Sequence, residues 1–539
     1  MKKGKVIVFG LDGATWNILR PMMDAGLLPN FSRVAKEGVW GTLKSTIPPV
    51  TPPAWATFVT GKNPGKHGLF GFVVNKHRAD VETTWANEYA IKTNKIWDLL
   101  DHLGRTSALI NIPITYPAKK INGWYVSGFL TPQGAKDVTY PPDLLEELNK
   151  KVDGYVINVA SGSGASIEDA KKFTKANVEC TRKRTDAMFH IWDKYDPDLN
   201  FPVYVGPDRI QHRYYGYLDP SNDAYNSSEA SEIRDIITEN YTQLDAILGE
   251  ILAKMDENTT LLVASDHGFG VLESYVSINL WLAEKGYLKY KKSGAWLREI
   301  DKKFGISNRL GNMKRLQANL TFDAKLEQII IMKETIAYAG DVYEEGIFLN
   351  VKGRQEHGIV EPGEEYEKIR DEIIEGLKEI NFPGTTKPLF SELLKKEDVY
   401  HGKYLDDAPD IVVVVNNHKS LITNNLPALK SKFVRPPKNV AEGTHEPDGI
   451  FMAWGASIKP DSNFGEYDIH DMTPTILHAM GEPYFSDMDG KPIYSIFSDE
   501  TTTEPAEPLS EADVDQDVSY SDEEQKEIEE RLRSLGYID

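Results

Sequence analysis

Cysteine, long apolar stretches and basic residues are all scarce in this sequence. The 539 residues include one cysteine, Cys180, so an internal disulfide is excluded and a reducing compartment is favoured. No apolar run reaches the length of about 18 residues that a membrane-spanning helix needs. Lys and Arg number 61 against 82 Asp and Glu, a net charge of −21 that argues against a nucleic-acid partner, because the phosphate backbone would be repelled.

The N-terminus resembles the start of a secretion signal but lacks the rest of one. Basic residues precede an apolar run over residues 6–11, which stops early, at Asp12, and no small-residue cleavage site follows. The composition, with 40% hydrophobic and 27% charged residues, is typical of a soluble globular protein. We therefore expect a cytoplasmic protein that does not associate with membranes.

The chain is longer than one hydrophobic core usually serves, so we expect more than one domain. Residues 499–524 contain many acidic residues and neither Lys nor Arg, a composition typical of a disordered linker. The expected organisation is a catalytic core formed by residues 1–280 and 401–498, an inserted α+β cap at 281–400, an acidic linker at 499–522 and a C-terminal helix at 523–539.

Short apolar runs alternate with helical patterns along much of the chain. Continuous apolar runs suit strands that are buried on both faces, as in a parallel sheet. Such runs occur at residues 6–11, 107–110, 202–205, 260–264 and 411–415. Amphipathic stretches such as residues 233–254 lie between them. The pattern predicts an α/β fold with a central, mostly parallel sheet and helices on both faces.

Acidic and histidine side chains follow several of these runs. Asp12, Asp208, Asp266 and His267 lie one to three residues beyond a predicted strand. Because ligands gather at the carboxyl ends of strands in α/β sheets, we expect a site there.

Thr51 precedes Pro52 and a helical pattern, which predicts a helix N-cap with proline in the first turn. A hydroxyl at that place lies where free N–H groups and the helix dipole favour anions, and where a phosphoryl group could be held. Thr51 is therefore either a simple cap or a nucleophile.

The acids and histidines also suit metal ions. Asp208 and His212 are four residues apart, and both face the same side if the segment is helical. Adjacent Asp266 and His267 lie before a glycine that lets the chain turn, and His445 lies in a glycine-rich loop. With a further carboxylate and the hydroxyl, the set can hold two divalent cations, and mixed Asp/His ligation favours Zn²⁺, with Mn²⁺ or Fe²⁺ as alternatives. The candidate ligands are Asp12, Thr51, Asp208, His212, Asp266, His267 and His445.

The order of these motifs resembles the alkaline phosphatase superfamily, and within it the type I phosphodiesterase/nucleotide pyrophosphatase family. The resemblance covers most of residues 5–490. It rests on Asp12-Gly13, Thr51-Pro52-Pro53, Thr60-Gly61, Pro64, His67-Gly68, Pro207-Asp208 with His212, Ser265-Asp266-His267-Gly268 and Gly443-Thr444-His445.

The resemblance also implies roles for the site residues. One metal ion would be held by Asp12, Asp266 and His267 with the Thr51 oxygen, and the second by Asp208, His212 and His445. Thr51 would attack phosphorus and form a phospho-threonine intermediate.

Two departures from related sequences stand out. Members of the phosphodiesterase branch often have an asparagine that contacts a phosphoryl oxygen, and the corresponding position here is Phe72, with Asn75 close by and Asn111 after another predicted strand. The sulfatase branch is disfavoured, because its Cys or Ser nucleophile and the Arg four residues later are here Thr51 and Trp55.

We therefore expect a two-metal phosphoester hydrolase that acts on a small phosphorylated substrate, with phosphodiesters preferred. A phosphomonoesterase, a phosphoryl-transfer enzyme and an inactive binding protein that keeps the fold remain alternatives. Residues 285–315 are basic and interleaved with aromatic side chains. They suit a surface helix, a cap that contacts an anionic substrate, or a peripheral membrane contact. The sequence does not indicate an oligomeric state.

Overall fold

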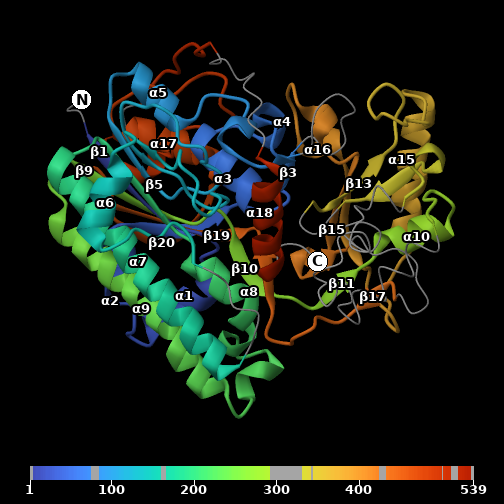
Figure 1. The fold of residues 1–539 in the computed structure, drawn as a ribbon, viewed down its shortest axis with the longest axis horizontal. Helices are drawn as coiled ribbons and strands as arrows, with labels where there is room; N and C mark the ends of the chain where they lie inside the picture. Colours follow the sequence, from blue (N-terminus) through green and yellow to red (C-terminus); the bar gives the residue numbers. More distant parts are fainter. Residues whose placement is uncertain are drawn as a thin grey trace.

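The computed structural model describes residues 4–74, 84–159, 166–291, 330–340, 344–423, 432–499, 502–510 and 520–535. Asn75, most of the basic segment at 285–315 and parts of the acidic linker lie outside these residues. In Figure 1 a large α/β body on the left carries a smaller lobe on the right, which contains α15 (Glu364–Lys378) and α10 (Ile278–Glu284).

A nine-stranded sheet forms the centre of the large body, in the order β20-β2-β19-β9-β1-β8-β5-β6-β7. The central strands β9, β1, β8, β5 and β6 are parallel, and β19 is antiparallel to both of its neighbours. The prediction of a mostly parallel sheet is therefore confirmed. The strand bounds are β1 Lys5–Leu11, β2 Val39–Lys44, β5 Ser107–Ile110, β6 Gly123–Val126, β7 Thr139–Tyr140, β8 Leu199–Tyr204, β9 Thr259–Ala264, β19 Asp448–Gly455 and β20 Asp461–Asp468.

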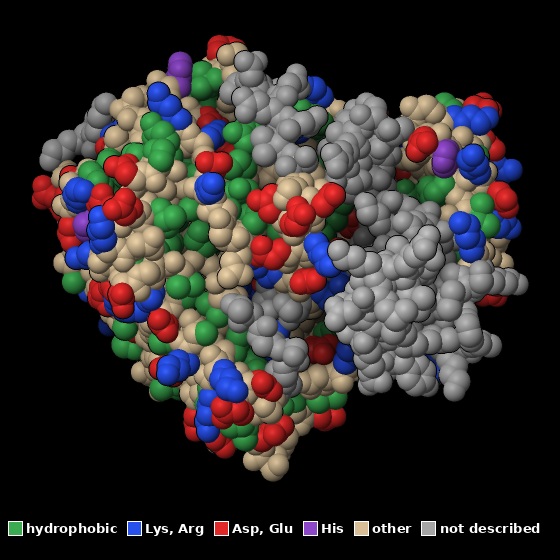
Figure 2. Space-filling model, viewed as in Figure 1, with side chains coloured by type: hydrophobic (Ala, Val, Ile, Leu, Met, Phe, Trp, Pro, Cys, Tyr) green, Lys and Arg blue, Asp and Glu red, His purple; other side chains and the backbone are tan. Residues whose placement is uncertain are grey.

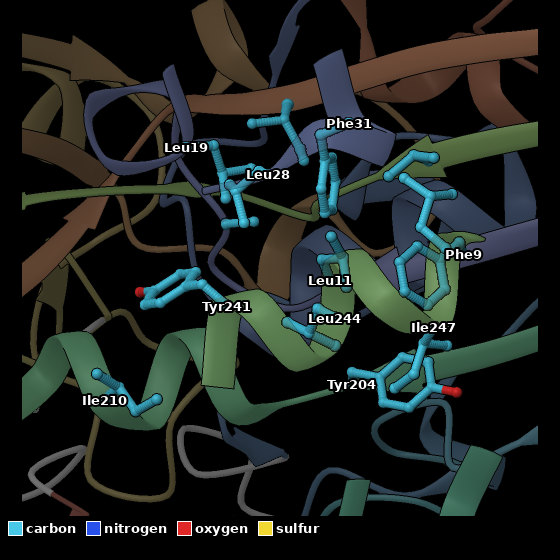
Figure 3. Close-up of a cluster of buried hydrophobic side chains, with 14 of the residues drawn as sticks. Phe9, Leu11, Leu19, Leu28, Phe31, Tyr204, Ile210, Tyr241, Leu244 and Ile247 are labelled. Atoms are coloured by element: carbon cyan, nitrogen blue, oxygen red, sulfur yellow. The ribbon is translucent and has the colours of Figure 1, made fainter. Parts of the chain in front are cut away.

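The two faces of the sheet bury alternate residues of each strand, as the period of two requires. In β1, Ile7, Phe9 and Leu11 belong to one apolar cluster, and Val6 and Val8 belong to the other. Figure 3 shows side chains of the first cluster packed between the strands and the helices. Helices on this face are α1 (Trp16–Asp24), α2 (Pro29–Glu37), α6 (Leu144–Val152), α7 (Ile167–Tyr195), α8 (Gly206–Leu218) and α9 (Ala230–Lys254).

The opposite face is covered by helices that are distant from one another in the sequence. They are α3 (Thr51–Thr60), α5 (Ile96–His102) and α17 (Met472–Ala479), and their apolar side chains share one cluster with β1, β8 and β9. Helices therefore cover both faces of the sheet, as predicted.

The smaller lobe has its own antiparallel sheet and its own apolar core. Its four strands run in the order β12-β13-β15-β14, with bounds β12 Ala337–Ala339, β13 Gly346–Leu349, β14 Phe390–Lys395 and β15 Ile411–Val415. The prediction that residues 411–415 join the parallel sheet was wrong. The apolar run reflects burial on both faces, because Val413 packs in the core of the lobe and Val412 packs with Tyr400 on the other side. An apolar run shows such burial but not the sheet in which it occurs.

Three small sheets lie outside these two. β10 (Gly268–Val271) pairs with β18 (Gly443–Glu446), and β3 (Val73–Val74) pairs with β4 (Thr84–Trp85). The third sheet contains β11 (Ser274–Val276), β16 (Ser420–Ile422) and β17 (Val434–Arg435). The chain thus leaves the large body after β10 and returns at β18. The parts of the large body that precede and follow the smaller lobe in the sequence therefore meet in this strand pair.

The described part of the C-terminal region packs against the large body. In residues 502–510, the N–H of Ala506 donates to the carbonyl of Tyr484 at 2.7 Å. Helix α18 (Asp522–Leu535) begins with a capping box in which the N–H of Ser521 donates to Glu524 at 2.9 Å. Its Ile528 and Leu532 are fully buried. None of the helices among the described residues combines the length and the apolar composition that crossing a bilayer requires.

Candidate active site

The structure brings all seven candidate ligands to the carboxyl edge of the parallel sheet. The residues come from three kinds of local setting, which are loops after strands, the N-terminal halves of helices, and the β10–β18 pair. Asp12 follows β1, Asp208 and His212 lie in α8, Asp266 and His267 join β9 to β10, His445 lies on β18, and Thr51 begins α3. All seven side chains are buried.

Asp12, Asp266 and His267 form the first cluster. His267 Nε2 lies 3.3 Å from Asp266 Oδ2 and 3.8 Å from Asp12 Oδ1. His267 Nδ1 lies 3.0 Å from the carbonyl oxygen of Gly268, and because a carbonyl only accepts, Nδ1 is the donor. The Nε2 lone pair therefore faces the two carboxylates, which is the tautomer that a metal ligand needs.

Asp208, His212 and His445 form the second cluster. Asp208 Oδ1 lies 3.3 Å from His212 Nε2 and 3.2 Å from His445 Nε2, and the two nitrogens are 3.0 Å apart. Three donor atoms separated by about 3.3 Å match one face of a tetrahedron around an ion with bonds of about 2.0–2.1 Å. The His267 and His445 rings stack with centroids 3.9 Å apart, so the two clusters are adjacent.

In the first cluster, burial and neighbouring carboxylates disfavour the ionised forms of both aspartates. Burial raises the pKa of Asp12 well above its ordinary value, and Asp208 raises it further. Burial and the neighbouring Asp12 carboxylate raise the pKa of Asp266 in the same way. Burial lowers the pKa of His267 well below its ordinary value, which leaves the ring neutral and able to bind a metal ion.

In the second cluster, the neighbouring histidines favour the ionised form of the carboxylate. Burial alone would raise the pKa of Asp208, but His212 and His445 beside it hold that pKa well below its ordinary value. Burial also lowers the pKa of His445. A carboxylate beside two imidazole nitrogens is a donor set that suits a divalent cation.

Two carboxylate oxygens of the first cluster are placed to bind a cation. Among the residues that the structure describes, Asp12 Oδ1 and Asp266 Oδ2 are fully buried and accept no hydrogen bond. A buried carboxylate oxygen without a partner is costly, and a cation bound between the two would offset that cost.

Thr51 is the first residue of α3 and does not cap the helix, so the N-cap prediction was wrong. Val50, with φ −124° and ψ 141°, is the N-cap, and no side chain caps the first turn. Because Pro52 and Pro53 have no N–H and the N–H of Ala54 bonds to the carbonyl of Val50 at 3.0 Å, this turn can offer an anion only the N–H of Thr51. The Thr51 hydroxyl lies 3.4 Å from His267 Nε2, at the edge of the first cluster.

Several contacts that the sequence does not signal hold these loops in place. Trp55 Nε1 donates to Asp12 Oδ2 at 3.0 Å. Gln211 Nε2 donates to the carbonyl of Gly13 at 2.7 Å, which joins α8 to the loop after β1. Tyr400 donates through its hydroxyl to the carbonyl of Ile47 at 2.6 Å, from outside the large sheet to the loop before Thr51. Single side chains of these types have no recognisable spacing in the sequence.

Two of the positions considered for the family's asparagine, Phe72 and Asn111, have other contacts. Phe72 is buried in an apolar cluster with Phe129, and the two ring centroids are 6.3 Å apart. Asn111 Nδ2 donates to the carbonyl of Ser127 at 2.7 Å, and its Oδ1 accepts from the Tyr155 hydroxyl.

Comparison with known proteins identifies the family. The family model for type I phosphodiesterase / nucleotide pyrophosphatase matches residues 6–448. Phosphonoacetate hydrolase from Sinorhizobium meliloti 1021, in complex with phosphonoacetate, is 14% identical with a TM-score of 0.52, over 89% of this chain and 95% of that chain, and shares the fold. Human ectonucleotide pyrophosphatase / phosphodiesterase 5 is 16% identical with a TM-score of 0.49, over 92% of this chain and 100% of that chain. No curated protein sequence matches. The chain belongs to the type I phosphodiesterase / nucleotide pyrophosphatase family, a family of metal-dependent phosphoester hydrolases.

Proposed function

We propose that the protein hydrolyses small phosphodiesters with two divalent metal ions and a phospho-threonine intermediate at Thr51. One observation carries the proposal: the two buried donor clusters are adjacent, and the hydroxyl of Thr51 lies 3.4 Å from a nitrogen of the first. Asp12, Asp266 and His267, with the Thr51 oxygen, would hold one ion. Asp208, His212 and His445 would hold the other. The mixture of carboxylate and imidazole donors favours Zn²⁺, with Mn²⁺ or Fe²⁺ as alternatives.

Two bound divalent ions would lower the pKa of the Thr51 hydroxyl and would offset negative charge on the phosphoryl oxygens. The chain supplies the nucleophile and its position. Thr51 Oγ1 forms a bond to phosphorus while the bond from phosphorus to the leaving alcohol's oxygen breaks. Water then cleaves the bond between Thr51 and phosphorus, which releases a phosphomonoester and restores the hydroxyl.

The position of Thr51 suits this role. Its side chain is fully buried, so bulk water does not compete for the hydroxyl in the free protein. The first turn of α3 adds the N–H of Thr51 and the positive end of the helix dipole, both of which favour the phosphoryl group.

The decisive experiment measures hydrolysis of bis-p-nitrophenyl phosphate and p-nitrophenyl phosphate with added Zn²⁺ or Mn²⁺. We expect turnover of the diester by the wild type and a loss in kcat on the order of 10³-fold or more in Thr51→Ala. Thr60→Ala is the matched control, because Thr60 is equally buried on the same helix and its hydroxyl makes local hydrogen bonds. It donates to the carbonyl of Ala56 at 2.7 Å and accepts from the N–H of Lys62 at 3.2 Å. Acid quenching during diester turnover and mass spectrometry should show a p-nitrophenyl phosphate group on Thr51.

Two results would change the proposal. Turnover of the monoester alone would keep the nucleophile but make the protein a phosphomonoesterase. A wild-type protein that binds neither metal ion would contradict the proposed chemistry.

A further inference from the structure

We propose that Trp55 is a positioning residue that orients the Asp12 carboxylate toward the metal ion, an inference that rests on the proposed function. Trp55 Nε1 donates to Asp12 Oδ2 at 3.0 Å, and both side chains are buried. The other oxygen, Asp12 Oδ1, is the one that faces His267 Nε2, at 3.8 Å. The indole therefore engages one oxygen of Asp12 and leaves the other for the ion.

An indole is chemically suited to this task. Its N–H only donates, and it has no lone pair with which to bind the metal ion itself. The hydrogen bond from Trp55 to Asp12 Oδ2 lies in a fully buried setting. In a buried site such a bond is stronger than in water, so it restricts the rotation of the carboxylate.

The same helix that presents Trp55 also presents the nucleophile. Thr51 and Trp55 are four residues apart in α3, so their side chains lie on one face of the helix. Thr51 reaches His267, which follows β9, and Trp55 reaches Asp12, which follows β1. One rigid and fully buried helix thus sets the position of the hydroxyl and of a metal ligand together, which is the arrangement that precise sites require.

The indole ring of Trp55 packs against strand β1 at a glycine, Gly10. A Cβ at Gly10, two residues before Asp12 on β1, would lie 3.0 Å from Trp55 Cη2 and 2.9 Å from Val203 Cγ2. The absence of a side chain at Gly10 therefore allows the ring to approach the strand. Phe58 and Phe201 pack against the ring with centroid distances of 5.2 and 6.1 Å. These contacts explain why the ring is held in one place.

The test is a calorimetric titration of metal-free, full-length protein with Mn²⁺ and separately with Zn²⁺. Trp55→Phe keeps an aromatic ring but removes the N–H, and we expect one of the two sites to lose about 10- to 100-fold in affinity. Trp97→Phe is the matched control, because Trp97 is fully buried and its Nε1 has no partner among the described residues. The Trp97→Phe variant should bind both ions as the wild type does. In Trp55→Phe alone, kcat should fall while KM stays unchanged.

A second measurement avoids any dependence on the stability of the variant. In wild-type protein labelled with ¹⁵N at tryptophan, the indole N–H resonance of Trp55 should shift during metal titration, and that of Trp97 should not. Wild-type affinity at both sites in Trp55→Phe, or an unchanged Trp55 resonance while metal ions bind, would overturn the inference. A wild-type protein that binds no metal ion would instead overturn the proposed function on which it rests.

Discussion

Thr51 Oγ1 lies 3.4 Å from His267 Nε2, although 216 positions separate the two residues in the sequence. Thr51 comes from a helix on one face of the sheet, and His267 comes from the loop that follows the central strand β9. The contact places the hydroxyl beside the first donor cluster without a hydrogen-bonded cap that would occupy it. The proposed nucleophile thus has a fixed position beside the groups that would bind a metal ion.

The first prediction concerns the stability of the metal-free protein. Burial and repulsion from neighbouring carboxylates raise the pKa values of Asp12 and Asp266, so their ionised forms oppose folding when no cation is present. Asp266→Asn can still accept the bond from the N–H of Gly13 at 3.1 Å. We expect the metal-free variant to be more stable than the metal-free wild type by about 1–3 kcal/mol, measured by urea unfolding at neutral pH.

Added metal ions should reverse that order. The wild type should gain stability with Mn²⁺ or Zn²⁺, by about 2.7 kcal/mol at 100 times the dissociation constant, and the variant should gain much less. Asp24→Asn, at an exposed position, is the control for the loss of a carboxylate. A metal-free Asp266→Asn protein less stable than the wild type would contradict the argument from charge.

The second prediction concerns pH and the buried His67. Burial lowers the pKa of His67 from 6.5 to about 3. Its Nδ1 accepts from the N–H of Leu69 at 3.2 Å, and its Nε2 lies 3.0 Å from the Thr57 hydroxyl, which agrees with a neutral ring. Between these two pKa values the unfolded chain binds a proton that the folded protein does not. Stability from His67 is therefore present above pH 6.5 and is lost as pH falls toward 3, by up to about 1.4 kcal/mol per pH unit.

His67→Asn isolates this effect. The asparagine oxygen can replace Nδ1 as the acceptor for Leu69, but the contact with Thr57 is lost, so the variant should be less stable at pH 7 by about 1 kcal/mol. In urea unfolding the stability difference should narrow below pH 7 and reverse its sign before pH 5, because only the wild type loses the contribution of His67. An exposed control, His102→Asn, accounts for the loss of an imidazole. A difference that does not change with pH would show that His67 titrates normally.

The third prediction concerns the docking of α18. Ile528 and Leu532 share an apolar cluster with Val50, which precedes Thr51. The outer surface of the helix is acidic in its first turn, and Figure 2 shows acidic side chains gathered in this part of the face. Ile528→Asp places a charge in that cluster, so the helix should detach while the two cores of the large sheet stay folded.

Limited proteolysis measures this detachment. A loss of about 2–5 kcal/mol in docking free energy raises the detached population, and hence the cleavage rate, by more than about tenfold. Glu530→Ala, at an exposed position of the same helix, should be cleaved like the wild type. Unchanged cleavage of Ile528→Asp would show that the apolar contacts of Ile528 do not hold the helix in place.

Local patterns in the sequence predict much of the candidate site. The spacing of Asp208 and His212 predicts two donors on one helical face, and the structure has both in α8, with 3.3 Å between Oδ1 and Nε2. The placement of Asp12 and Asp266 after apolar runs predicts the carboxyl edge of a parallel sheet, and β1 and β9 are parallel neighbours. These predictions succeed because the period of a strand or a helix is a local property of the chain.

Other features escape prediction because they depend on packing between distant segments. The apolar run at 411–415 belongs to a separate antiparallel sheet, although its composition matches that of the parallel strands. Thr51 starts the helix without capping it, because the geometry of Val50 sets the helix start. Trp55 has no motif of its own, and its hydrogen bond to Asp12, 43 positions away, depends on how α3 packs against the sheet.

By itself the sequence determined the fold class, the family and the set of residues able to hold metal ions, since these follow from periodicity, residue chemistry and the order of motifs. Only the tertiary structure decided which donors meet, that the two clusters are adjacent, and that a tryptophan supports Asp12. The physical reason is that contacts between segments hundreds of residues apart depend on strand order and helix packing. Those features result from burial summed over the whole chain, which no single stretch of residues specifies.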